Sequence, residues 1–284
     1  NDQNVKKISG YITKKVAEKL EELFKKDRED YEKKWNDISI FIEYGMIADP
    51  KFFERAEKFM LFKDTEGKYY TIEEYKKLIE ENQKNKDNRL VYLYATNADE
   101  QYSNIENAKN KGYNVLLMDG ILDSHFISTY EQKYGDCHFA RVDSASIDKL
   151  IEKEGDSNES KLNDEQKENI KKAFENVIDK VTFNVEFSNL GENDAPVEII
   201  QNEFMRRMKD MSAMGGGMQM WGSMPDNYIL MLNTNNPIIA GLADKSEEEQ
   251  ANIIKHLYDL ARLSKNLLKG KDLNEFVKRS FNQI

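Results

Sequence analysis

Cysteine is almost absent from this sequence, since Cys137 is the one thiol among 284 residues. A single cysteine excludes an intramolecular disulfide framework and a metal site built from several thiolates, so we predict no metal centre and a reducing compartment. Long apolar runs are lacking as well. No segment approaches the roughly 20 residues of a membrane-spanning helix, and the start at Asn1 lacks the apolar core of a signal peptide. We therefore expect a cytoplasmic protein without a membrane partner.

The sequence has fewer basic than acidic residues. The 52 Asp and Glu residues outnumber the 42 Lys and Arg residues, which gives a net charge of -10. The lysines are spread between the acidic residues, so no broad basic face can neutralise phosphates, and we expect no nucleic-acid partner. With 39% hydrophobic and 33% charged residues, the composition is that of a globular protein, and the length suits two domains.

Catalytic motifs are also lacking. The histidines His125, His138 and His256 are far apart in the sequence, and neither a Gly-x-Ser-x-Gly elbow nor a His-Glu-x-x-His pair occurs. Cys137 and His138 are sequence neighbours, and their side chains would diverge on a strand. The sequence therefore predicts no catalytic residue. An α/β enzyme domain of unknown substrate remains the alternative.

The first part of the chain begins with helical patterns. Apolar residues recur at helical spacing in three segments, which predicts helices at residues 5–24, 31–44 and 50–62. Thr71 and Glu74 have the spacing of a capping box, which predicts the start of a short fourth helix.

A strand pattern follows. Residues 90–95 and 113–118 are short apolar runs separated by a polar helical stretch, which predicts two parallel strands joined by a crossover helix. The turn after the first run, residues 96–99, has none of the glycines that let backbone approach a phosphate, so dinucleotide binding is not expected. We predict a small three-layer α/β subdomain preceded by helices, within a first domain of residues 1–150.

The second part of the chain starts after a polar stretch. We predict a linker at residues 151–163 and a second domain at residues 164–284. Residues 181–187 alternate between apolar and polar, which predicts a strand with one buried face. A second strand near residues 196–200 is expected to pair with it through the turn at residues 191–194. The fold class is therefore α/β followed by α+β, the second domain combining helices with a short sheet and ending in a dimerising helical hairpin.

A methionine-rich segment is the most unusual feature. Residues 204–231 contain eight of the 11 methionines and are interrupted by three consecutive glycines. Methionine side chains are flexible and polarizable, so such a surface can adapt to partners of different shape. The candidate contact residues for non-native proteins are Phe204, Met205, Met208, Met211, Met214, Met218, Met220, Trp221 and Met224. Two alternatives remain: Phe204, Met208 and Met211 face the core, or the thioethers bind copper.

The last two predicted helices carry apolar faces joined by a short connection at residues 269–271. One helical hairpin leaves part of this surface uncovered, whereas two copies form a four-helix bundle with a symmetric contact. The candidate interface residues of a homodimer are Ile253, Leu257, Leu260, Ala261, Leu268, Leu273, Phe276, Val277 and Phe281. The alternative is that the hairpin packs on its own domain.

Several of these segments resemble one known family. The run at residues 203–211, the glycines with Met218 beyond them, and residues 225–237 are similar to the carboxy-terminal domain of bacterial HtpG, the ninety-kilodalton heat-shock chaperone family. Residues 4–16 resemble the long helix of its middle domain, and residues 114–123 resemble its small α/β subdomain. One departure is Asn236, where relatives often have His.

The resemblance implies a homodimeric chaperone that binds partly unfolded client proteins. In that family an amino-terminal domain binds ATP and Mg, and the middle domain supplies a catalytic Arg just before the segment that resembles residues 1–16. The resemblance therefore implies a fragment with neither the nucleotide pocket nor that Arg, and with no cofactor of its own. A purely structural dimerisation module remains the alternative to client binding.

Overall fold

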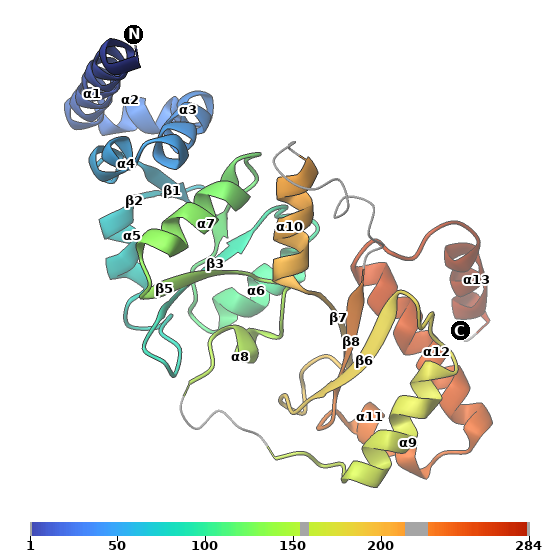
Figure 1. The fold of residues 1–284 in the computed structure, drawn as a ribbon. Helices are drawn as coiled ribbons and strands as arrows, with labels where there is room; N and C mark the ends of the chain where they lie inside the picture. The colour runs from blue at the N-terminus through green and yellow to red at the C-terminus, as the bar shows by residue number, and fades with distance from the viewer. Residues whose placement is uncertain (1, 154–158, 214–226, 283–284) are drawn as a thin grey trace. The chain divides into compact units, whose positions relative to one another are not determined.

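The computed structural model describes residues 2–153, 159–213 and 227–282 (Figure 1). The chain divides into two compact units, Asn1–Val142 and Asp143–Ile284. Both combine helices with small sheets, so the fold is mixed α/β, as predicted at the level of fold class. The division between the units precedes the predicted linker at residues 151–163. The exact domain limits stay a prediction.

Unit 1 begins with a layer of helices. These are α1 (Asp2–Lys26), α2 (Arg28–Lys33), α3 (Trp35–Ala48) and α4 (Pro50–Ala56). The helix predicted at residues 31–44 is wrong in its start, because a break at Lys34 separates α2 from α3. Asp49 caps α4 by accepting the Lys51 N–H at 2.8 Å, and Pro50 occupies the first turn, as expected.

Helix α4 is shorter than predicted. It ends at Ala56, and Phe62 lies in strand β1 (Leu61–Lys63), which pairs antiparallel with β2 (Tyr69–Thr71). The buried carboxylate of Asp64 organises the turn between the strands by accepting the N–H groups of Glu66 and Lys68, both at 2.9 Å. These hydrogen bonds favour the hairpin over a longer helix.

The predicted capping box is present. The Thr71 hydroxyl accepts the Glu74 N–H, and the Glu74 carboxylate accepts the Thr71 N–H, at the start of α5 (Ile72–Ile79). Each bond satisfies a backbone donor that the first helical turn leaves free.

The main sheet of unit 1 has the strand order β4-β3-β5. Its strands are β3 (Leu90–Ala95), β4 (Leu116–Leu117) and β5 (Cys137–Arg141), all parallel, which confirms the predicted parallel pair although β4 is shorter than expected. The associated helices are α6 (Tyr102–Asn110) and α7 (Asp123–Lys133). Every residue of β3 is buried, and Tyr92 stacks on Phe139 at 4.7 Å within an aromatic core.

Unit 2 contains a second small sheet. In chain order its elements are α8 (Ile147–Leu150), α9 (Asp164–Glu175), β6 (Phe183–Ser188), β7 (Val197–Gln201), α10 (Glu203–Ala213), β8 (Tyr228–Asn233), α11 (Pro237–Ala240), the 3-10 helix η1 (Gly241–Asp244), α12 (Glu247–Ser264) and α13 (Gly270–Phe281). Helix α9 packs against β6 and α12, so one face of the sheet has a helical cover. Buried residues of β6, β7 and β8 form the core with α9 and α12.

The predicted hairpin of β6 with β7 is wrong. The strand order is β6-β8-β7, with β8 parallel to β6 and antiparallel to β7. Strand β8 occupies the centre because it is the most apolar of the three: Leu230, Met231 and Leu232 are all buried, so both of its faces are covered. In β6 the predicted alternation holds, with Phe183 and Val185 buried and Asn184 and Glu186 exposed.

The last connection also differs from the prediction. Helix α12 ends at Ser264 and α13 begins at Gly270, so residues 265–269 join them rather than residues 269–271. Gly270 has a φ of 58°, a left-handed conformation that glycine adopts without strain. Leu268 therefore lies in the connection rather than on a helix face, and it is buried.

Candidate protein-interaction surfaces

Helix α10 presents an aromatic side chain to solvent. Asn202 begins the helix by accepting the Met205 N–H at 3.2 Å. Phe204 is 64% exposed, so it does not face the core, whereas Met205 and Met208 are half-buried. An exposed phenylalanine beside two accessible thioethers is an apolar contact surface.

Charged residues of α10 pair with one another. The Glu203 carboxylate accepts from Arg207 Nε at 2.7 Å and from Arg206 at 3.2 Å, and the Arg206 side chain is buried. Because all three residues belong to α10, these ion pairs stabilise the helix itself. Arg206 is buried on the side of α10 opposite Phe204, which leaves Phe204 on the exposed side.

The rest of the methionine-rich candidates are not described. The side chain of Met211 in α10 lies outside the described residues, as do Met214, Met218, Met220, Trp221 and Met224. Their contact with non-native proteins stays a prediction, and so does the copper alternative.

The candidate interface residues of α12 and α13 fall into two groups. Leu257, Ala261, Leu268 and Phe276 are buried within unit 2 itself, and Ile253 and Leu273 are half-buried. Three of the predicted residues reach the surface, namely Leu260, Val277 and Phe281, the last of them 71% exposed. Leu263, which is not among the predicted residues, is exposed on α12 as well. Part of the predicted seam therefore serves the core of one copy, and the assignment of the whole set to an interface stays a prediction.

Ion pairs fasten α13 to α12. The buried carboxylate of Asp259 accepts from Arg279 and lies 3.5 Å from Arg262, which also pairs with Asp272 at 2.9 Å. Phe276 contacts the ring of His256 at 5.6 Å. A cavity of about 710 Å³ beside these residues carries both signs of charge, mostly paired with each other. It favours no charged ligand.

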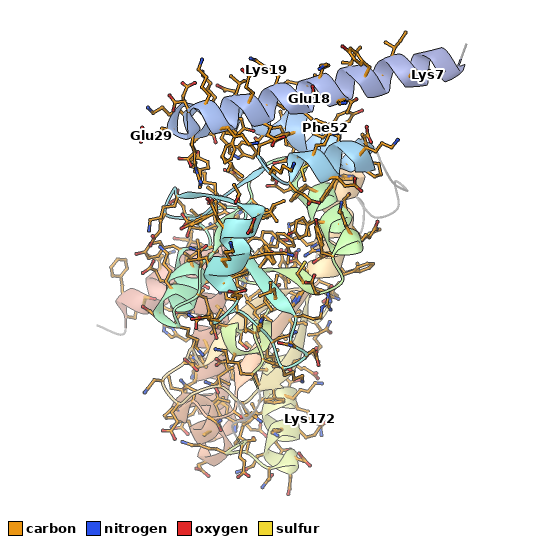
Figure 2. The ribbon with its side chains drawn as sticks, turned by 90° about the vertical axis from the view of Figure 1, so that its left-hand side faces the viewer. Lys7, Glu18, Lys19, Glu29, Phe52 and Lys172 are labelled. Carbon is orange, nitrogen blue, oxygen red and sulfur yellow. The ribbon has the colours of Figure 1, made fainter. Side chains whose placement is uncertain are left out.

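A third apolar surface was not predicted. A groove of about 680 Å³ lies between α1 and the pair α3 and α4, and is lined by Ile12, Val16, Phe41, Tyr44 and Phe52, among others. Figure 2 shows Phe52 beneath the middle of α1, whose first turns, near Lys7, extend away from the rest of unit 1. The predicted apolar face of α1 is thus covered only toward its end, where Leu20 and Phe24 pack on the core.

A sequence signal for this groove existed. Residues 40–44 read Ile, Phe, Ile, Glu, Tyr, so α3 is apolar on more than one side. Ile42 is buried, which leaves Phe41 and Tyr44 on the outside.

Cys137 has the environment of an inert thiol. It is buried on β5, and burial, reinforced by the nearby Asp136 carboxylate, raises its pKa to about 12. The Cys137 Sγ–H donates to the Tyr134 carbonyl at 3.4 Å. A thiol that remains protonated is a poor nucleophile. Within the ranges that the structure describes, no three His, Cys, Asp or Glu side chains are placed to hold a metal ion.

The comparisons with known proteins identify the family. The family model described as "Hsp90 protein" matches residues 1–284. The chain belongs to the Hsp90 family. This confirms the resemblance predicted from the motifs at residues 203–211 and 225–237.

Among curated Hsp90 relatives, "Chaperone protein HtpG" of Bacteroides thetaiotaomicron is 43% identical, over 100% of this chain and 52% of the relative. The protein of the same name from Porphyromonas gingivalis is 50% identical, over 84% of this chain and 35% of the relative. That of Wolinella succinogenes is 28% identical over 97% of the chain. The chain thus spans about half the length of the first of these relatives. No helix among the described residues is long and apolar enough to cross a membrane.

Proposed function

We propose that this chain is the client-binding and dimerising part of an Hsp90 chaperone, and that it acts in the cytoplasm. It combines the end of the middle domain, including the small α/β subdomain, with the carboxy-terminal dimerisation domain. The observation that carries the proposal is the exposure of Phe204 beside the half-buried Met205 and Met208 on α10. An apolar patch of this kind suits contact with a partner protein.

The chemistry of this surface suits non-native protein chains. Covering a phenylalanine side chain contributes about 1.5–3 kcal/mol, which is enough for reversible contact but too little for a permanent complex. Met205 and Met208 flank Phe204 and can change conformation to fit different side chains. The surface would therefore hold many apolar segments weakly and select no single sequence.

Dimerisation is proposed on the outer side of α12 and α13. Leu260, Leu263, Val277 and Phe281 are exposed on these two helices. A second copy would bring the same four side chains against them in a symmetric contact.

ATP hydrolysis is assigned to other parts of the longer protein. In full-length relatives, by resemblance, ATP and Mg bind to the amino-terminal domain. The strand–helix turn of this chain at residues 96–99 has no glycine, and it is closed by Gln101, whose Oε1 accepts the Thr96 N–H at 2.8 Å. We therefore expect calorimetry with ATP to give no stoichiometric binding, and micromolar binding would contradict this part of the proposal.

The decisive experiment replaces Phe204. The Phe204→Ser variant should melt at the same temperature as the parent and suppress the aggregation of a heat-denatured client less well, because an exposed side chain contributes little to folding. Tyr102→Ser is the matched control, since Tyr102 is equally exposed but lies on α6 of unit 1. Unchanged suppression by Phe204→Ser, or an equal loss in Tyr102→Ser, would refute the proposal.

A further inference from the structure

Two buried carboxyl groups lie on α3 and α7, two helices that pack against each other. Glu43 lies in α3 and Asp123 is the first residue of α7, and each is only 8% exposed. Among the described residues, neither forms an ion pair with a lysine or an arginine. Buried charges in folded proteins are almost always paired with an opposite charge or a metal ion. This pair therefore needs another explanation.

The surrounding charges do not supply a cation. The second charged group that acts on Glu43, after Asp123, is Asp119, an exposed carboxylate in the loop before α7. His125 also lies on α7, with its Nδ1 buried and without a hydrogen-bond partner. The charged side chains on the other neighbours of α3 are exposed or paired with each other. On α4, Lys51, Glu54 and Arg55 are exposed. Glu57 pairs with Lys133, and Arg28 on α2 pairs with Glu32 and Glu74.

A bound proton on one of the two carboxyl groups removes the need for a cation. Burial raises the pKa of Glu43 well above its usual value, and the charges of Asp123 and Asp119 raise it further. Burial also raises the pKa of Asp123, but its Oδ2 accepts the Gly120 N–H at 2.8 Å, which favours the charged form. No donor to the Glu43 carboxyl is found in the part of the chain that the structure describes. The proton therefore resides on Glu43, and Asp123 carries the charge.

We propose that the contact of α3 with α7 is a proton-dependent clasp, closed while Glu43 is protonated and loosened when both carboxyls are charged. With both groups ionised, two like charges would be buried at one helix contact in a medium of low polarity, which would separate the helices or draw in water. The opening is local, because α4 remains attached to α7 where Phe53 stacks on Phe126 at 6.5 Å. Loosening would thus concern α3 and the groove that it forms with α1.

The direction of the pH dependence follows from the raised pKa values. A folded carboxyl that holds its proton to higher pH than the unfolded one stabilises the closed contact at acidic pH. That stabilisation decreases as pH rises past the usual carboxyl range, and it is fully lost once Glu43 ionises in the folded chain. Most surface carboxylates titrate well below the pH at which Glu43 ionises, so they do not change the stability of this contact at that pH.

Hydrogen exchange of the whole chain at pH 6 and pH 9, corrected for the intrinsic exchange rate, tests the clasp. Amides of α3 and of the first turn of α7 should lose about tenfold in protection at the higher pH, which corresponds to one pKa unit of coupling. Glu43→Gln keeps the shape of the side chain without its charge and should retain protection at both values. Glu54→Gln is the matched control, because Glu54 is exposed on the adjacent α4 and should behave like the parent.

An equal loss of protection in Glu43→Gln and in the parent would overturn the proposal. A carbon-13 NMR titration of the Glu43 carboxyl in the unaltered chain decides the matter even if the variant folds poorly. Half-titration above neutral pH supports the clasp, and half-titration at the usual carboxyl value overturns it.

Discussion

The side chain of Asn233 holds the backbone of Gly191 beside the end of β8. Its Nδ2 donates to the Gly191 carbonyl at 2.8 Å, and its Oδ1 accepts the N–H of the preceding Leu190 at 3.2 Å. Asn233 is 1% exposed, so these bonds are shielded from water. They secure the connection from β6 to β7, which would otherwise leave buried backbone groups without partners.

Replacing Asn233 should therefore destabilise unit 2. In Asn233→Ala the buried N–H groups of Leu190 and Asn235 lose the Oδ1 that accepts them, and each buried polar group left without a partner costs about 1–3 kcal/mol. The urea midpoint of the unit 2 transition should fall accordingly. Asn184→Ala is the control, since Asn184 makes one exposed bond to Asn227 and its loss should change stability by less than about 0.5 kcal/mol. Equal midpoints for the two variants would disprove this role of Asn233.

Acid sensitivity of unit 1 is predicted at Glu74. Its two carboxylate oxygens accept from Arg28 at 2.5 and 2.8 Å, and these bonds, aided by the Thr71 N–H, lower its pKa to about 2. A lowered folded pKa gives stability that is present above the usual carboxyl range and is lost as pH falls toward 2. Because both side chains are more than a third exposed, we expect the effect to stay below about 1 kcal/mol.

The measurement is the unfolding free energy of unit 1 between pH 5 and pH 2. Glu74→Gln retains an oxygen for the Thr71 N–H but cannot ionise, so its stability should change less over this interval. Glu80→Gln serves as the control, because Glu80 is exposed at the end of α5. Identical slopes for the parent and Glu74→Gln would contradict the prediction.

Local features of this fold could be predicted from the sequence. The capping box of Thr71 and Glu74 is encoded within four residues, and the buried strand β3 is encoded in one continuous apolar run. The order of strands could not be predicted, because periodicity shows which side of a strand is buried but not which strand lies beside it. The central place of β8 depends on packing between segments far apart in the chain.

The candidate surfaces could be predicted less completely. Helical spacing placed Leu257 and Phe281 on the same expected interface, although Leu257 is buried within unit 2 and Phe281 is largely exposed. An apolar stripe does not reveal whether its cover is the same chain or a second copy. Glu43 gave one local hint, a single acid within an apolar helical run, but the facing Asp123 comes from a distant segment.

Dimerisation should depend on the outer face of α12 and α13. Leu260→Asp and Val277→Asp place a carboxylate on that face, and burying an unpaired charge there costs several kcal/mol, comparable to the net free energy of a modest interface. We expect both variants to sediment as monomers with unchanged circular dichroism. Leu78→Asp is the control, because Leu78 is similarly exposed on α5 of unit 1. Dimeric variants with an intact fold would show that the contact lies elsewhere.

The last prediction concerns the methionine-rich segment beyond α10. If Met218, Met220 and Trp221 contact clients, replacing all three by Ser should weaken the suppression of aggregation without changing the melting temperature, because side chains awaiting a partner contribute little to folding. If Trp221 instead docks in the core, its removal should lower the unfolding free energy by about 3 kcal/mol or more. Two copies of the segment in a dimer would gain from engaging one client chain together, so the same loss should appear in Leu260→Asp. A triple variant that melts early, or that suppresses aggregation as well as the parent, would refute the contact role.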